Sequence, residues 1–134
     1  MSEAQMDLTP NQFSWNELCT SDVEAAKAFY GKVFGWSFAA APAPNDDYQM
    51  ASAGELPVAG IMSMPPNAPA GMPPSWGAYI TVESCDATVD ATQAAGGSVI
   101  VPATDVPNVG RFAMLADPQG AFFGIMEYHV SGDC

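Results

Sequence analysis

The residues best suited to acid–base chemistry are a carboxylate and a phenol on two predicted strands. Glu17 lies in the predicted strand 13–19, where alternation places it on the same face as Trp15. A carboxylate beside an indole is poorly solvated, which favours its protonated form, raises its pKa and suits it to proton transfer. Tyr79, in the predicted strand 76–83, supplies the phenol. We take Glu17 and Tyr79 as candidate catalytic residues; Glu17 could instead pair with a ligand amine or reach solvent at the edge of its site.

The other reactive side chains fit catalysis less well. Cys19 shares a face with Glu17, but no histidine stands near it in the pattern to activate a thiolate. The single histidine, His129, lies near the end of the chain, and one ligand cannot form a metal site. Three cysteines at wide spacing do not indicate a disulfide framework, and reduced thiols are typical of a cytoplasmic protein.

An internal repeat predicts the elements that position these residues. Short segments of the first half recur in the second half at nearly one spacing, which indicates a chain built from two copies of one unit. Gly60-Ile61-Met62 recurs 64 residues later as Gly124-Ile125-Met126, and Trp15, Asp22 and Gly35 fall 62 residues before Gly77, Ser84 and Gly97.

Each copy reads as a strand, a helix and three strands. The first helix starts with a capping-box pattern, Ser21 followed by Glu24, and ends at Gly35. Alternation and turn residues predict strands at 13–19, 36–41, 48–53 and 56–64, then at 76–83, 98–102, 111–116 and 121–128, with a second helix over 84–95. We predict an α+β fold of two βαβββ units, forming a curved eight-stranded mixed sheet around a cleft with the helices on its outer faces.

The domain organisation follows from these elements. We expect a loose N-terminal arm at residues 1–12, a single domain over 13–129 and a tail at 130–134. Within the domain, unit one is 13–64 and unit two is 76–129, and a proline-rich link over 65–75 joins them. No apolar run approaches the ~18–20 residues of a membrane span, and the N-terminus lacks a signal pattern, so we expect a soluble cytoplasmic protein.

The charge balance is strongly acidic. Fifteen acidic residues against three basic ones give a formal net charge of -12. A surface of this kind repels nucleic acid and anionic lipid, so we expect neither as a partner. The single arginine, Arg111, is expected to form a structural ion pair with Asp105 or Asp117 rather than to hold an anionic ligand.

The side chains predicted to face the cleft are mainly aromatic residues, methionines and glycines. The glycines would open volume, and tryptophan and methionine suit a flat apolar ligand. We expect the cleft to bind a small apolar or aromatic molecule, possibly a cation; alternatively, these side chains fill the core between the sheets. Besides Glu17, Tyr79 and Val58, the cleft residues are Phe13, Trp15, Gly60, Met62, Met64, Gly77, Phe122, Gly124 and Met126.

Two pairs of segments carry a family resemblance. The first pair is residues 22–30 with Phe34-Gly35-Trp36, and the second is Ala95-Gly96-Gly97 with Asp117-Pro118-Gln119-Gly120. With these segments the chain resembles, over residues 13–127, the vicinal oxygen chelate superfamily of glyoxalase I, bleomycin-resistance proteins and extradiol dioxygenases. The resemblance implies the fold described above and a ligand site in the cleft.

The places where metal-dependent members of that superfamily hold His and Glu ligands are altered here. The resemblance implies one such place early in the first strand and one in the last strand of each unit. In this chain the four places are Trp15, Gly60, Gly77 and Gly124, and none of these side chains can coordinate a metal. We therefore expect no metal and no other cofactor.

These observations favour a metal-independent small-molecule binding protein of the glyoxalase and bleomycin-resistance type. The alternative is a metal-free lyase or isomerase with Glu17 as general base, so enzymatic activity stays an open question at this point. A metal-dependent glyoxalase or dioxygenase is disfavoured by the four altered positions. Family members of this length pair as dimers, and open sheet edges need cover, so we expect a homodimer.

Overall fold

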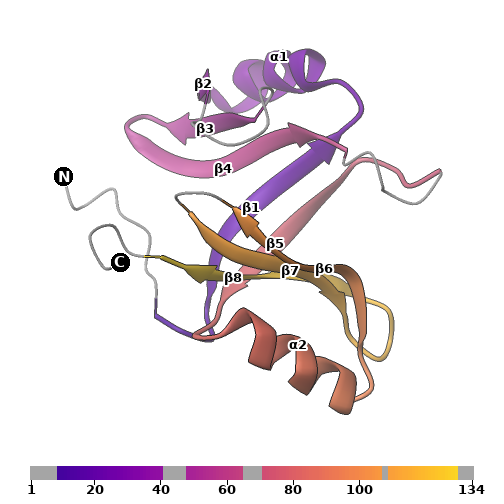
Figure 1. The fold of residues 1–134 in the computed structure, drawn as a ribbon. Coiled ribbons are helices and arrows are strands. Elements are labelled where there is room, and N and C mark those ends of the chain that lie inside the picture. The colour runs from indigo at the N-terminus through magenta and orange to yellow at the C-terminus, as the bar shows by residue number, and fades with distance from the viewer. Residues whose placement is uncertain (1–8, 41–47, 65–70, 107–108, 130–134) are drawn as a thin grey trace. The chain divides into compact units, whose positions relative to one another are not determined.

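The computed structural model describes residues 9–40, 48–64, 71–106 and 109–129. Within these ranges the chain forms eight strands and two helices (Figure 1) and divides into two compact units. Unit 1 is Trp15–Gly77, and unit 2 combines residues 9–14 with residues 78–129. The α+β class and the two βαβββ copies are confirmed. The predicted tail, most of the predicted arm and residues 65–70 of the link lie outside the described residues.

Unit 1 contains four strands and one helix. The elements are β1 (Phe13–Thr20, whose first two residues belong to unit 2), α1 (Val23–Phe34), β2 (Ser37–Ala40), β3 (Gln49–Ala53) and β4 (Leu56–Ser63). The strand order is β2-β3-β4-β1, with β3 antiparallel to both neighbours and β4 parallel to β1. α1 packs against β4.

Unit 2 repeats this arrangement. Its elements are β5 (Ser75–Thr81, which begins in unit 1), α2 (Cys85–Ala94), β6 (Ser98–Val106), β7 (Gly110–Ala116) and β8 (Phe122–Tyr128). The strand order is β5-β8-β7-β6, with β8 parallel to β5 and antiparallel to β7. Neither described helix combines the length and apolar character of a bilayer-spanning segment.

The helix starts confirm the repeat and correct one residue. Asp22 accepts a hydrogen bond from the backbone N–H of Ala25 at 3.0 Å, and Ser84 accepts one from Ala87 at 3.1 Å. The two N-caps therefore occupy the positions that the 62-residue separation pairs. The predicted capping box at Ser21 is wrong by one residue, because Asp22 next to it is the cap.

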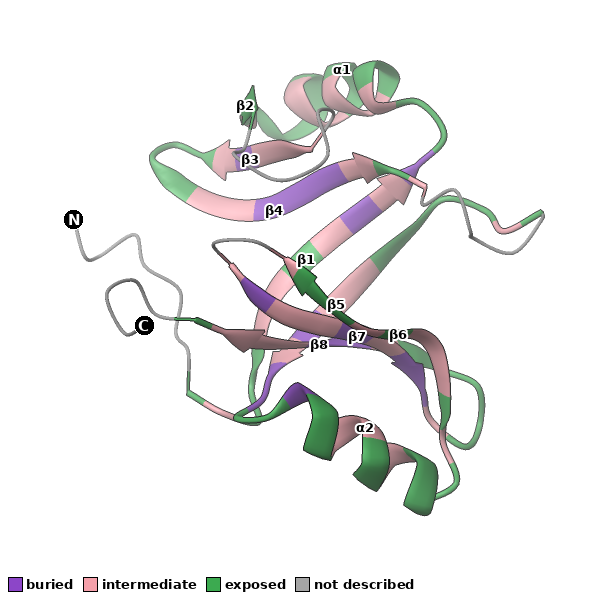
Figure 2. Cartoon of the chain, in the orientation of Figure 1, coloured by how far each residue is buried: buried purple, intermediate pink, exposed green. Residues whose placement is uncertain are grey.

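The two units bury different amounts of their helices. In unit 2, α2 covers a cluster of buried side chains, namely Val82, Cys85, Ala113, Leu115 and Ile125. In unit 1 the buried apolar residues are Leu18, Ala51, Ala59 and Ile61, all on strands, and α1 has no buried residue. Figure 2 shows the contrast, because the start of α2 is drawn as buried and no part of α1 is.

Most strand ends lie within two residues of the prediction, and two features differ from it more clearly. β6 runs to Val106 instead of ending at Pro102. Its register with β7 shifts between Val101 and Thr104, so Pro102, which has no backbone N–H, is not required to donate a hydrogen bond to β7. Residues of the predicted loose arm are also tied down. Asn11 donates a backbone hydrogen bond to Thr81, and Gln12 accepts one from it.

Candidate functional site

The sheet face predicted to hold the ligand is filled by tyrosine in unit 1. Gly60 lies opposite Glu17 in the parallel pairing of β1 and β4. A side chain at Gly60 would collide with the ring of Tyr48, and the hydroxyl of Tyr48 accepts a hydrogen bond from Nε1 of Trp15 at 3.1 Å. Gly60 therefore makes room for a tyrosine of the same unit.

Unit 2 uses the same device. Gly124 lies opposite Tyr79 in the parallel pairing of β5 and β8, and a Cβ at Gly124 would approach the Tyr79 ring to 2.6 Å. The Tyr79 side chain is only 6% exposed. The expectation that glycines open volume for a ligand is thus wrong at Gly60 and Gly124. It stays possible at Gly77, where the nearest atom to an added Cβ is the Glu17 carbonyl oxygen at 3.9 Å.

The other predicted ligand-binding residues differ in how far they are exposed. Phe13 is 68% exposed and Phe122 is 50% exposed, so both rings lie largely in solvent. Trp15, Met62, Met64 and Met126 are half-buried. Their role in binding stays a prediction, as does the cleft expected between the units.

The two predicted catalytic residues belong to different units. Glu17 is half-buried on β1 of unit 1, whereas Tyr79 lies on the part of β5 that belongs to unit 2. Their joint action in proton transfer stays a prediction. Near Glu17, burial and the negative charge of that carboxylate raise the pKa of Cys19 from 9.0 to about 11. The Cys19 thiol is therefore protonated at neutral pH, which agrees with its expected lack of nucleophilic reactivity.

The single arginine is held by two aspartates. Arg111 donates from Nη1 to Asp105 at 2.9 Å and from Nε to Asp86 at 3.1 Å, and these hydrogen bonds raise its pKa. The predicted pairing with Asp105 is confirmed. Asp117 instead accepts backbone hydrogen bonds from Gln119 and Ala121 within its own turn. An arginine paired with two carboxylates is a structural tie between β7, β6 and α2.

The described donor set does not fit a divalent metal ion. Glu127, on β8, accepts a hydrogen bond from the backbone N–H of Cys85 at 2.8 Å, and His129 lies 3.6 Å from its other oxygen. Across the described residues, no three side chains of His, Cys, Asp or Glu gather into a possible metal site. Tyrosine rings, furthermore, occupy the space beside Gly60 and Gly124, where the resemblance places ligands.

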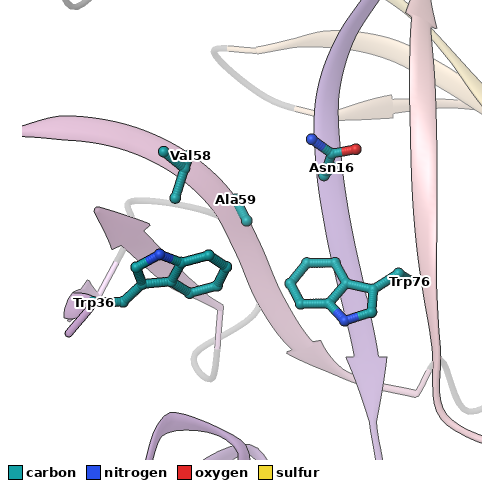
Figure 3. A pocket seen from close by; sticks show the side chains of 5 residues that line it. All are labelled: Asn16, Trp36, Val58, Ala59 and Trp76. Carbon is teal, nitrogen blue, oxygen red and sulfur yellow. The ribbon is translucent and has the colours of Figure 1, made fainter. Parts of the chain in front are cut away.

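A hollow of about 440 Å³ lies within unit 1 (Figure 3). Its lining is two tryptophans, two aliphatic side chains and one amide: Trp36, Trp76, Val58, Ala59 and Asn16. Along β1, Asn16 is out of phase with the predicted site residues Trp15 and Glu17. The hollow therefore opens on the opposite side of that strand from the predicted site.

Tyr30 of α1 fixes the two tryptophans. Its ring stacks on Trp36 with ring centroids 5.6 Å apart and meets Trp76 edge-on at 5.5 Å. Its hydroxyl accepts a hydrogen bond from Nε1 of Trp76 at 3.0 Å. The two indoles meet edge to face at 6.2 Å, so a flat molecule cannot pass between them. It would lie against Trp76, which is 42% exposed.

Sequence reasoning missed this hollow, apart from the predicted cleft residue Val58, because it followed one face of each strand. Val58 lies at the register shift between β3 and β4, where strict alternation is interrupted. Trp36 appeared only in a family motif and as the first residue of the predicted strand 36–41, and Trp76 only as the first residue of the predicted strand 76–83. A usable signal was nonetheless present. Trp76 alternates out of phase with Gly77 and Tyr79, so strand periodicity alone places its indole on the other face.

Comparisons with known proteins agree with this fold. A model of the Glyoxalase/Bleomycin resistance protein/Dioxygenase superfamily matches residues 11–125. The putative glyoxylase CFP32 of Mycobacterium tuberculosis (strain CDC 1551 / Oshkosh) is 44% identical over 121 residues, which are 89% of this chain and 45% of that protein. The anthracycline biosynthesis protein DnrV of Streptomyces peucetius is 32% identical over 128 residues, 87% of this chain and 46% of that protein. The chain thus spans less than half the length of these relatives.

Solved structures with little sequence identity share the fold. Methylmalonyl-CoA epimerase from Mycobacterium tuberculosis aligns with a TM-score of 0.62 at 13% identity, over 97% of both chains. The Mn(II)-bound glyoxalase from Novosphingobium aromaticivorans aligns with a TM-score of 0.56 at 19% identity, over 92% of this chain and 40% of that one. With its two βαβββ units and the family match over residues 11–125, the chain belongs to the Glyoxalase/Bleomycin resistance protein/Dioxygenase superfamily.

Proposed function

We propose that this chain is a metal-independent small-molecule binding protein that holds an apolar or aromatic ligand in the hollow beside Trp36 and Trp76. The observation that carries the proposal is the hollow itself, about 440 Å³ in volume and lined by two indoles, two aliphatic side chains and one amide. Ligand sites in proteins typically measure ~300–1,000 Å³ and combine apolar walls with few polar groups. Among the described residues, no group of three His, Cys, Asp or Glu side chains could hold a metal ion, which supports binding without a metal.

The proposed ligand lies flat against Trp76 and takes one hydrogen bond from Asn16. Trp76 is the more exposed of the two indoles, and its hydrogen bond to Tyr30 holds it in place before the ligand arrives. A surface fixed in advance loses little conformational entropy on binding. Val58 and Ala59 complete the apolar wall, and the Asn16 amide can donate or accept.

Charge favours a cation over an anion of the same shape. The chain carries a formal net charge of -12, and Arg111, one of its three basic residues, is paired with two aspartates. A cation above an indole also gains from the ring quadrupole. A flat aromatic ligand is consistent with the name of the Streptomyces peucetius relative, which refers to anthracycline biosynthesis.

Calorimetric titration with the planar cation proflavine tests the proposal. Replacing Trp76 with alanine should weaken proflavine binding by roughly tenfold, or about 1.4 kcal/mol, because the stacking surface is lost. The matched control is Leu56→Ala, which removes another exposed apolar side chain of the same unit that does not line the hollow. Equal affinities of wild type and Trp76→Ala would place binding elsewhere and overturn the assignment.

A second titration isolates the role of charge. Anthraquinone-2-sulfonate has a similar three-ring shape but carries a negative charge. At low salt it should bind more weakly than proflavine, and the difference should shrink as salt screens the protein. If the anion binds as tightly as the cation, charge does not contribute to ligand selection, and binding depends on the apolar contacts alone.

A metal-free lyase or isomerase is the second candidate, because Glu17 is half-buried on the face that the family uses for its chemistry. Proton abstraction by Glu17 would exchange deuterium from D₂O into a carbon acid such as hydroxyacetone, which NMR detects. Glu17→Gln should abolish this exchange and leave proflavine affinity unchanged, since Glu17 does not line the hollow. If wild-type protein catalyses no exchange, this candidate fails for ketone substrates.

A further inference from the structure

We infer that the hollow of unit 1 recognises a quaternary ammonium group, which lies in the corner between the indole faces of Trp36 and Trp76 (Figure 3). The planes of the two indoles stand at 87° to each other, and their centroids lie 6.2 Å apart. The inference rests on the proposed function, because it concerns the same hollow. It names the charged group that the ligand carries.

The corner between the two indoles suits a compact cation. A cation is attracted to an aromatic ring when it lies over the ring face and within ~6 Å of the ring centroid. A flat ring can lie against only one of two perpendicular faces. One quaternary nitrogen, by contrast, can lie over both faces at once, with its methyl groups in contact with both rings. Groups of aromatic rings that surround a cation in this way are a known means of binding quaternary ammonium ligands.

Trp76 offers the ligand a ring face rather than a hydrogen bond. Its Nε1–H donates to the hydroxyl of Tyr30 at 3.0 Å, so the one donor of this indole is already used within unit 1. Tyr30 also stacks on Trp36 with centroids 5.6 Å apart. Both walls of the corner are therefore held before a ligand arrives, and they lose little conformational entropy when it covers them.

The polar lining of the hollow discriminates between kinds of ammonium group. A primary ammonium carries three N–H donors, and burying them is costly unless protein acceptors replace water. Among the five described residues that line the hollow, only Asn16 has a polar side chain, and none has a carboxylate. A quaternary ammonium has no N–H donor. It can therefore enter this hollow without leaving a donor unsatisfied.

Charge separates the quaternary ammonium from a neutral group of the same shape. The formal net charge of -12 attracts cations to the chain, and no basic side chain is among the five that line the hollow. A tert-butyl group would fill the same corner but would gain only apolar contacts. The ratio of the two affinities therefore measures the electrostatic part of recognition.

An NMR titration of isotope-labelled wild-type protein with three small alcohols tests the inference. Choline carries the quaternary ammonium, 3,3-dimethylbutanol replaces it with a tert-butyl group, and ethanolamine replaces it with a primary ammonium. At constant ionic strength choline should bind about fivefold or more tightly than either analogue. The indole N–H signals of Trp36 and Trp76 should report the binding. Trp15 is the internal control, because its indole donates to Tyr48 and does not line the hollow.

Two variants of one residue separate the ring face from general apolar contact. Trp76→Leu keeps an apolar side chain but removes the aromatic face, and it should weaken choline binding by about fivefold. Trp76→Phe keeps an aromatic face and should retain more of the choline affinity than Trp76→Leu. The affinity for 3,3-dimethylbutanol should be similar in both variants. The comparison of the three alcohols needs only the wild-type chain, so it decides the matter even where a variant fails to fold.

Three results would overturn the inference: no saturable shift of the two indole signals with choline, an analogue that binds as tightly as choline, or an unchanged choline affinity in Trp76→Leu. Proflavine titration of the same samples distinguishes this failure from that of the proposed function. If proflavine binding depends on Trp76 but choline is not preferred, only the present inference fails. If proflavine affinity is unchanged in Trp76→Ala, the proposed function fails.

Discussion

Two glycines in this chain are explained by the rings beside them. Gly124 faces Tyr79 across β5 and β8, and a Cβ there would lie 2.6 Å from ring carbons. In a buried sheet this contact cannot be relieved without moving the tyrosine, whose side chain is 6% exposed. The pairing of glycine with tyrosine occurs in both units, since Tyr48 covers Gly60 in the same way. In both copies of the repeat, the glycine thus provides the space that the tyrosine ring fills.

Gly124→Ala is expected to lower the free energy of unfolding by about 1–3 kcal/mol through overpacking. Urea denaturation measures the change. Gly77→Ala is the matched control, because an added Cβ there meets nothing closer than 3.9 Å, and the cost should be near zero. In a Tyr79→Leu background, Gly124→Ala should cost less than in wild type. An equal cost in both backgrounds would show that the ring is not the cause.

Cys19 is the second residue whose surroundings predict a measurable property. Burial, with a smaller contribution from the charge of Glu17, raises its pKa to about 11. Alkylation of the native protein by iodoacetamide should therefore reach half its maximal rate at Cys19 near pH 11 rather than near the ordinary value of 9.0. Mass spectrometry of the peptide that contains Cys19 gives this rate. A midpoint near 9 would contradict the assigned environment.

The same shift affects stability in a defined direction. The unfolded thiol ionises near 9.0 and the folded one near 11, so the unfolded state binds fewer protons between these values. The contribution of the neutral thiol is complete below pH 9 and is lost as the pH rises through about 11. The stability difference between wild type and Cys19→Ala should shrink over that range and stay constant below it.

Among the elements, the helix starts offer the clearest test of the repeat. Asp22 and Ser84 cap α1 and α2 with hydrogen bonds to the third following backbone N–H. Asp22→Ala and Ser84→Ala should each lower the free energy of unfolding by about 1 kcal/mol. Ser21→Ala, the control, should change it little, because Ser21 is not the cap. If Ser21→Ala lowered the free energy of unfolding more than Asp22→Ala, Ser21 would be the N-cap, as the capping-box pattern predicts.

Local signals explain why most elements could be predicted from the sequence. The positive φ of 73° at Gly35 ends α1 where a glycine after a helical pattern indicates, and alternation fixed most strand positions within two residues. The N-cap was missed by one residue because Ser21 and Asp22 are both good caps and stand side by side. β6 was cut short because a proline normally ends a strand.

The site depended on contacts that no local pattern contains. Tyr48 fills the space at Gly60 from a different strand, and Tyr30 fixes Trp76 across 46 residues of sequence. Alternation shows which face a side chain takes but does not show which distant ring covers it. The absence of metal ligands at the four family positions, by contrast, could be read directly, because it depends on residue identity alone.

At the scale of the whole molecule, the net charge of -12 is spread over a chain with only three basic residues. Lys27 pairs with Glu24 and Arg111 with two aspartates, so most carboxylates have no cation to balance them. Mutual repulsion of this kind favours the expanded unfolded chain over the compact one. The fold therefore carries an electrostatic cost that salt can relieve.

Raising NaCl from low to near-molar concentration should raise the melting temperature, because the screening length falls from about 30 Å at 0.01 M to about 3 Å at 1 M. The triple variant Glu55→Gln, Glu83→Gln, Asp90→Asn removes three exposed carboxylates and changes the net charge from -12 to -9. It should melt higher than wild type at low salt and respond less to added NaCl. Melting curves at several salt concentrations measure both effects. If the two proteins gain equally from salt, the rise reflects general salt effects on apolar surface, and self-repulsion is not what limits the stability of this chain.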